Sequence, residues 1–156
     1  MDKTKQKIAF SFLIAIFLAA FEGVVVSTAA PVIVKSLHNF KMISWIFSIF
    51  LLTSAISTPI YGKLADLYGR KRIFMIGISI FLFGSLLAGL SQTMHQLIIF
   101  RGIQGIGAGA IFTIGFTMIG DIFTLEERSI IQGAISTIWG IAGLVGPLLG
   151  GFLIDY

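Results

Sequence analysis

The sequence lacks cysteine and contains few charged residues. Its 156 residues include no Cys, and Asp, Glu, Lys and Arg together make up 12%. Without Cys the chain has no disulfides and no thiolate metal sites. Hydrophobic residues make up 56% and the mean hydropathy is +1.00, which leaves too little polar surface to cover a soluble globule of this size. The composition therefore indicates an integral membrane protein.

The residue patterns of several function classes are also missing. The sequence contains no phosphate-binding loop, no metal constellation and no nucleophile beside a base, so ATP-driven transport and enzymatic catalysis have no support. The pI near 9.6 is compatible with nucleic-acid binding, but the basic residues lie at the ends of apolar runs and not along one face. We expect no enzymatic activity, no cofactor, no metal and no nucleic-acid partner.

Long apolar runs separated by short polar clusters fill the chain. In lipid, an open sheet would leave backbone groups unpaired, and strands of a closed barrel would alternate polar and apolar residues, which these runs do not. The sequence therefore predicts an all-α integral membrane fold whose partner is the lipid bilayer. The predicted spans cover residues 8–34, 43–61, 73–90, 96–119 and 130–154.

The distribution of Lys and Arg predicts the orientation of these spans, because positive residues near span ends stay in the cytoplasm. Of the basic residues outside the predicted spans, only Lys35 and Lys41 lie on one side of the membrane, and the others lie on the opposite side. The amino terminus is therefore expected in the cytoplasm and the chain in the plasma membrane. Five spans end on the outer side, so we expect a truncated chain, residues 1–156, that forms most of a six-helix amino-terminal bundle. The opposite, cytoplasmic side holds Lys3, Lys5, Lys7, Lys63, Arg70, Lys71, Arg72 and Arg128.

The loop between the second and third spans, GKLADLYGRKR, carries the strongest motif. It resembles the loop motif of the major facilitator superfamily, and the resemblance implies alternating access by two six-helix bundles. In that family the loop latches the cytoplasmic side against the other half of the transporter. A plain positive-inside loop would explain the basic residues but not the acid and the glycines. The matching gate-loop residues are Gly62, Leu64, Ala65, Asp66, Gly69, Arg70, Lys71 and Arg72.

Physical chemistry alone gives this loop a function as well. Gly62 and Gly69 allow close backbone approach and a sharp turn. Asp66 can accept charge-assisted hydrogen bonds from Arg70 or from a nearby helix amino terminus. Such a cluster can hold one helix bundle against another.

The fourth span contains an arginine, in the segment LIIFRGIQGIGAG. An arginine inside a span costs several kcal/mol unless it faces a cavity, pairs, or snorkels to the interface. Gln104 and Gly105 share the face of Arg101, so that face is polar and narrow. The segment resembles the fourth-helix motif of the superfamily, which implies a role for Arg101 and Gln104 in proton movement. The alternative is that Arg101 reaches the headgroups.

The fifth span contains small residues and a proline, in GIAGLVGPLLGG. It resembles the fifth-helix motif of antiporters in the superfamily, although Ala142 stands where the first glycine would fall. The small residues allow close helix approach and Pro147 bends the helix, which suits a mobile interface. Ordinary membrane packing is the alternative. The residues that carry this prediction are Gly143, Gly146, Pro147, Gly150 and Gly151.

The first span contains an acidic residue, Glu22, followed nine positions later by Pro31. This spacing resembles the first-helix motif of the drug:proton antiporter branch with fourteen spans, although Val24 and Ser27 depart from it. Within the bilayer a carboxylate should be protonated, paired or in water. We therefore predict that Glu22 handles coupling protons or a cationic substrate, with a structural pairing such as Arg101 as the alternative.

Together the motifs predict a secondary transporter driven by the proton gradient that exports drugs or other small lipophilic or cationic compounds. The predicted partners are this small-molecule substrate and the missing second half of the transporter. Because a central site needs both halves, the competing hypothesis is a transport-incompetent remnant or a membrane interaction subunit.

Overall fold

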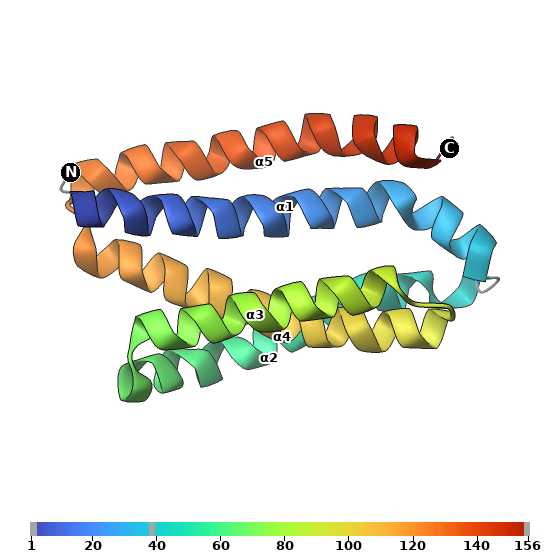
Figure 1. Ribbon diagram of the computed structural model, residues 1–156, viewed down its shortest axis with the longest axis horizontal. Coiled ribbons are helices and arrows are strands. Elements are labelled where there is room, and N and C mark those ends of the chain that lie inside the picture. Colours follow the sequence, from blue (N-terminus) through green and yellow to red (C-terminus); the bar gives the residue numbers. More distant parts are fainter. Residues whose placement is uncertain (1–2, 38–39, 155–156) are drawn as a thin grey trace. The chain divides into compact units, whose positions relative to one another are not determined.

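The computed structural model describes residues 3–37 and 40–154, and the side-chain surroundings of residues 146 and 149–154 lie outside the description. Throughout these ranges the regular structure is helical (Figure 1), and five helices are long and apolar enough to cross a membrane. The predicted all-α membrane fold is therefore confirmed. The elements are α1 (Lys3–Leu37), the short 3-10 turn η1 (Phe40–Met42), α2 (Ile43–Tyr68), α3 (Arg70–Gly89), α4 (Met94–Ile122) and α5 (Leu125–Ile154).

The helices extend past the apolar runs into polar sequence. α1 begins at Lys3, before the first apolar residue of its run, and α2 continues beyond its run through Asp66 to Tyr68. Hydropathy marks only the part of a helix that faces hydrocarbon, whereas Lys, Leu and Ala favour helix on either side of that boundary. The polar motif between the second and third spans is consequently mostly helical and not an open loop.

A single residue separates α2 from α3. Gly69 has φ of 90° and ψ of 134°, a conformation that residues with a Cβ rarely adopt. Its amide donates to the carbonyl of Ala65 at 3.0 Å, which closes the last turn of α2. The chain then reverses, and α3 runs antiparallel to α2 (Figure 1). Of the two motif glycines, Gly69 is therefore the one that the turn requires.

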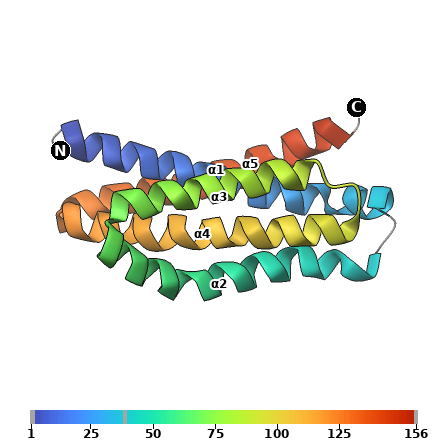
Figure 2. The ribbon, with the colours of Figure 1, turned by 60° about the horizontal axis from the view of Figure 1, so that its bottom comes forward.

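The chain divides into two compact units, one made of Met1–Ile33 with Thr117–Tyr156 and the other of Val34–Phe116. In the second unit α4 lies between α2 and α3 (Figure 2). Glycines of α4 allow this approach on both sides. A Cβ at Gly107 would lie 2.7 Å from the Cα of Phe81 on α3, and one at Gly109 would lie 2.7 Å from the carbonyl oxygen of Ser54 on α2.

Polar contacts accompany the α2–α4 packing. The hydroxyl of Ser57 on α2 donates to the carbonyl of Ser54 at 3.0 Å and to that of Ile106 on α4 at 3.4 Å. Ser57 is itself buried, with 6% of its surface exposed. Small and hydroxylated residues thus take the place of large apolar side chains at this contact, as in other membrane helix pairs.

In the first unit, α1 and α5 run in the same direction (Figure 1), and an ion pair joins their amino-terminal ends. Lys5 Nζ lies 3.2 Å from Glu127 Oε2 and 5.7 Å from the centroid of the Phe123 ring. Glu127 also accepts from the Thr124 amide at 3.2 Å, while the Glu127 amide donates to the Thr124 hydroxyl at 3.4 Å. This reciprocal pair is a capping box at the start of α5.

Arg128 completes the turn from α4 into α5. Its Nε donates to the carbonyl of Phe123 at 2.9 Å, and its guanidinium also bonds the carbonyl of Gly120. The Gly120 carbonyl belongs to the last turn of α4, whose acceptors have no partner within the helix, and Phe123 is the first residue after that turn. Side chains thus cap both the end of α4 and the start of α5.

We predict opposite effects for two Gly→Ala substitutions in helix interiors. A Cβ at Gly105 would overlap the Thr53 hydroxyl and the Phe50 carbonyl, whereas a Cβ at Gly133 meets nothing within 4 Å. Gly105→Ala should destabilise by about 1–3 kcal/mol through overpacking. Gly133→Ala should be neutral or stabilise by up to about 1 kcal/mol through helix propensity. Thermal unfolding in detergent, followed by Trp45 and Trp139 fluorescence, measures both; equal shifts would contradict the tight α2–α4 contact.

Candidate functional site

The second unit contains a buried polar cluster on α4. Arg101 is 3% exposed and Gln104 is fully buried. The Arg101 guanidinium donates to Gln104 Oε1 at 2.7 Å, and its central carbon lies 4.3 Å from the centroid of the Phe50 ring on α2. A charge-assisted hydrogen bond and a cation–π contact therefore hold one guanidinium.

The close approach of α2 places Phe50 against this arginine. Gly102 and Gly105 present no side chain to α2, and a Cβ at Gly102 would lie 3.3 Å from Ile49 Cγ1. Thr53, one turn beyond Phe50, donates to the Ile49 carbonyl at 2.8 Å and so satisfies its hydroxyl within α2. Helical spacing of three residues brings Gln104 beside Arg101 on the same face.

This geometry distinguishes between the two interpretations of Arg101. The residue lies about 10 Å along α4 from Met94, within reach of a headgroup for an extended side chain. The guanidinium instead lies over Phe50 and bonds Gln104, with almost no exposed surface. The structure thus favours a paired interior arginine over a snorkelling one.

The side-chain amide nitrogen of Gln104, Nε2, remains available to donate to a further partner. This nitrogen is buried, and among the described residues it has no hydrogen-bond acceptor. Buried polar groups are usually paired with protein or ordered water, so an open donor beside a fixed positive charge is a place where a water or a polar ligand gains a hydrogen bond. The pair can therefore hold an anionic or carbonyl oxygen.

Glu22 lies in the interior of α1 and is half-buried. The rings of Phe17 and Phe21 stack just before it, with centroids 5.9 Å apart. Glu22 belongs to the first unit and Arg101 to the second. Glu22 is thus an acidic residue on an apolar helix, and it takes part in at least one interaction with other residues.

The gate-loop residues lie around the α2–α3 corner. Asp66 is exposed near the end of α2, and its carboxylate forms neither a hydrogen bond nor an ion pair with the described residues, so the expected contact with Arg70 is not made here. A Cβ at Gly62 would meet open space. Arg70, Lys71 and Arg72 form the first turn of α3.

The predicted antiporter-motif residues lie in the second half of α5, which contains Pro147 within the helix. A Cβ at Gly143 would meet nothing within 4 Å, so no other part of the described chain packs there. The surroundings of Gly146, Gly150 and Gly151 lie outside the described residues. Close helix approach is thus seen at the glycines of α4 and not at Gly143.

Sequence reasoning missed the residues of α2 that complete the site. Phe50 supplies the ring over Arg101, and Thr53 and Ile49 lie against the α4 glycines. The sequence did hold a partial signal, because a run of glycines around a buried arginine requires a close neighbour. It did not show which helix this neighbour was.

Comparison with protein families identifies the class of protein. A polytopic helical fold with a paired arginine inside a span is typical of membrane proteins that move polar or charged solutes. The family model of the Major Facilitator Superfamily matches residues 12–156. The chain therefore belongs to this superfamily, which consists of transporters and not of enzymes.

Curated relatives narrow the resemblance to efflux proteins. The chain is 42% identical to "Multidrug resistance protein 3" of Bacillus subtilis over 99% of this chain and 31% of the relative. It is 43% identical to "Multidrug transporter protein MdtP" of the same organism, over 92% of this chain and 26% of the relative. "Efflux pump dotC" of Dothistroma septosporum is 40% identical, over 88% of this chain and 24% of the relative. The chain thus spans less than a third of the length of these relatives.

We predict that Gln104→Leu destabilises the fold by about 1.5–3 kcal/mol, because it removes the Oε1 acceptor of a buried guanidinium. Gln104→Glu restores an acceptor and should recover most of the loss. Gln132→Leu, at an exposed position of α5, is the matched control and should lie within about 0.5 kcal/mol of the parent. Thermal unfolding in detergent tests all three. A Gln104→Leu variant as stable as Gln132→Leu would show that the buried hydrogen bond contributes nothing.

Proposed function

We propose that this chain forms part of a proton-coupled exporter of drugs or other small lipophilic or cationic compounds, in the plasma membrane. The buried Arg101–Gln104 pair is the observation that carries the proposal. A membrane protein retains a charge in a span when that charge has a task in the solute or proton pathway. Relatives named for multidrug transport and efflux support the direction and the substrate class.

The coupling residue in this proposal is Glu22. A carboxyl on an apolar helix is stable when it is protonated, paired or hydrated, and it exchanges between these states as its surroundings change. A proton and a cationic substrate compete for the same negative group, so protonation lowers the affinity for the substrate. By linkage, substrate binding lowers the affinity for the proton to the same extent. One acid is therefore sufficient to couple proton entry to substrate release.

Arg101 and Gln104 provide a fixed polar group within the second unit. The guanidinium stays charged at any physiological pH, and its position is set by Phe50 and by Gln104 Oε1. The remaining Gln104 donor offers a hydrogen bond to a water on a proton pathway or to a substrate oxygen. Their task in this proposal is to keep a polar site within the spans for the moving proton or for the substrate.

Access to the site alternates between the two sides of the membrane in this proposal. The distribution of Lys and Arg supports a cytoplasmic amino terminus in this proposal. The residues from Gly62 to Arg72 then form a cytoplasmic latch, and the second half of α5, around Pro147, forms a moving interface. Rocking of helix bundles about a central site supplies the motion.

A second candidate is a transport-incompetent remnant or a membrane interaction subunit. It is favoured by the exposed apolar face of α2, where Leu51, Leu52, Ile56 and Ile60 are each more than half exposed. Such a face can bind helices of another protein as readily as it faces lipid.

Ethidium movement in energised everted vesicles separates the two candidates. We expect the chain to accumulate ethidium above an empty-vector control, and an uncoupler to abolish the difference. Glu22→Gln should reduce accumulation to the vector level, because an amide cannot exchange a proton. Glu126→Gln, on an exposed acid at the start of α5, is the matched control and should retain accumulation within about twofold of the parent.

The outcomes assign the function. Accumulation that survives the uncoupler or Glu22→Gln would contradict proton coupling through Glu22. No accumulation above the vector, at equal amounts of folded protein in the membrane, would reject transport of this cation by the chain and favour the interaction subunit.

A further inference from the structure

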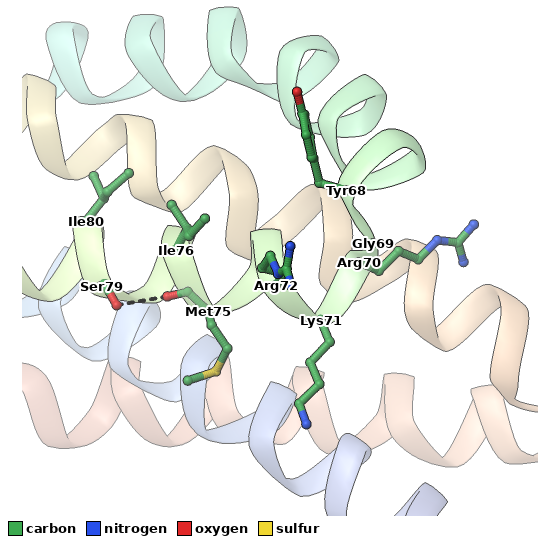
Figure 3. Close-up of a pocket in the computed structure, with 9 residues that line it drawn as sticks. All are labelled: Tyr68, Gly69, Arg70, Lys71, Arg72, Met75, Ile76, Ser79 and Ile80. Atoms are coloured by element: carbon green, nitrogen blue, oxygen red, sulfur yellow. Dashed lines mark hydrogen bonds between the residues drawn. The ribbon is translucent and has the colours of Figure 1, made fainter.

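A groove lies at the corner between α2 and α3, within the second unit. Its volume is about 810 Å³ and it opens to the surface (Figure 3). The groove begins at the residue that ends α2 and follows α3 for three turns. Its lining consists of Tyr68, Gly69, Arg70, Lys71, Arg72, Met75, Ile76, Ser79 and Ile80.

One end of the groove is strongly basic. Lys71 and Arg72 are both exposed, whereas the Arg70 side chain points away from the rest of the lining (Figure 3). The lining contains no acidic residue, and the first turn of α3 has neither an acid nor a side-chain cap. Asp66 does not line the groove. The positive charge at this end is therefore not balanced by a carboxylate of the lining.

The other end of the groove is apolar. Met75 and Ile76 are 56% and 44% exposed, and the Ser79 hydroxyl is turned back to the Met75 carbonyl at 2.9 Å (Figure 3). Exposed apolar side chains continue along the helix at Leu82, Phe83 and Leu86. The helical rise from Met75 to Leu86 is about 16 Å, close to the thickness of one leaflet of hydrocarbon.

We propose that this groove binds an anionic phospholipid, whose phosphate is bound at the basic end of the groove by Lys71 or Arg72 and whose acyl chain follows α3 from Met75 to Leu86. The two ends of the groove match the two ends of such a lipid in charge, in polarity and in length. A soluble phosphate would match only the basic end, and a zwitterionic lipid carries a cation that the basic residues repel. Basic pockets at the cytoplasmic ends of membrane helices are typical sites for anionic headgroups. The assignment to the cytoplasmic leaflet rests on the orientation given under Proposed function.

Native mass spectrometry of the detergent-purified chain tests this site. We expect phosphatidylglycerol to bind at least about tenfold more tightly than phosphatidylcholine with the same acyl chains, because two basic residues act on the headgroup. Lys71→Gln/Arg72→Gln should reduce this preference to about parity. Lys35→Gln/Lys41→Gln removes the same net charge from exposed positions at the other end of the unit and should keep the preference.

Two further arms separate the lipid from other ligands. sn-Glycerol 3-phosphate at equal concentration should not compete, and Ile76→Asn should weaken phosphatidylglycerol binding without removing the headgroup preference. Circular dichroism confirms that each variant remains helical. Equal binding of the two lipids by the parent, a preference that persists in Lys71→Gln/Arg72→Gln, or an equal loss in both double variants would overturn the proposal. Full competition by glycerol phosphate would assign the groove to a soluble anion instead.

Discussion

The approach of α4 to α2 at Gly105 is the constraint on which the polar interior of this protein depends. Phe50 and Gln104 lie against the Arg101 guanidinium and help this charge to remain inside an apolar helix. Phe50 reaches it only because the α4 glycines present no Cβ to α2. The stability of the fold and the burial of the Arg101 charge thus depend on the same contact between α2 and α4. A side chain added at Gly105 would disturb both.

Much of the fold follows from the sequence, because a backbone in hydrocarbon must form its hydrogen bonds within the protein. Each long apolar run had to be a helix, and each run lies in one. The capping box at Thr124 and Glu127 and the turn at Gly69 also follow from local chemistry. The ends of the helices do not, since α2 continues through the motif to Tyr68 where hydropathy has already fallen. Hydropathy reports the solvent around a helix and not its hydrogen bonds.

Only part of the site could be predicted from the sequence, because the sequence does not show which helices touch or where side chains point. Arg101 and Gln104 are three residues apart on one helix, so their pairing follows from helical geometry. Phe50 is far away in the sequence and carries no mark that separates it from the many other phenylalanines. The basic residues after Gly69 appear equivalent in the sequence, yet the three side chains extend in different directions from the start of α3, and that of Arg70 points away from the other residues that line the groove. Contacts between helices and side-chain directions need three-dimensional structure.

Glycine-rich sequence has two different outcomes in α4 and α5. In α4, Gly105 and Gly109 lie against the backbone of α2, and Gly107 lies against the backbone of α3. In α5, Gly140 and Gly143 face open space, and their large apolar neighbours Trp139 and Leu144 are 47% and 73% exposed. Small residues beside exposed large ones form a surface that admits another helix at short distance. No described part of this chain occupies the α5 surface at Gly140 and Gly143, whereas the α4 surface at Gly105 already packs against α2 beside Arg101.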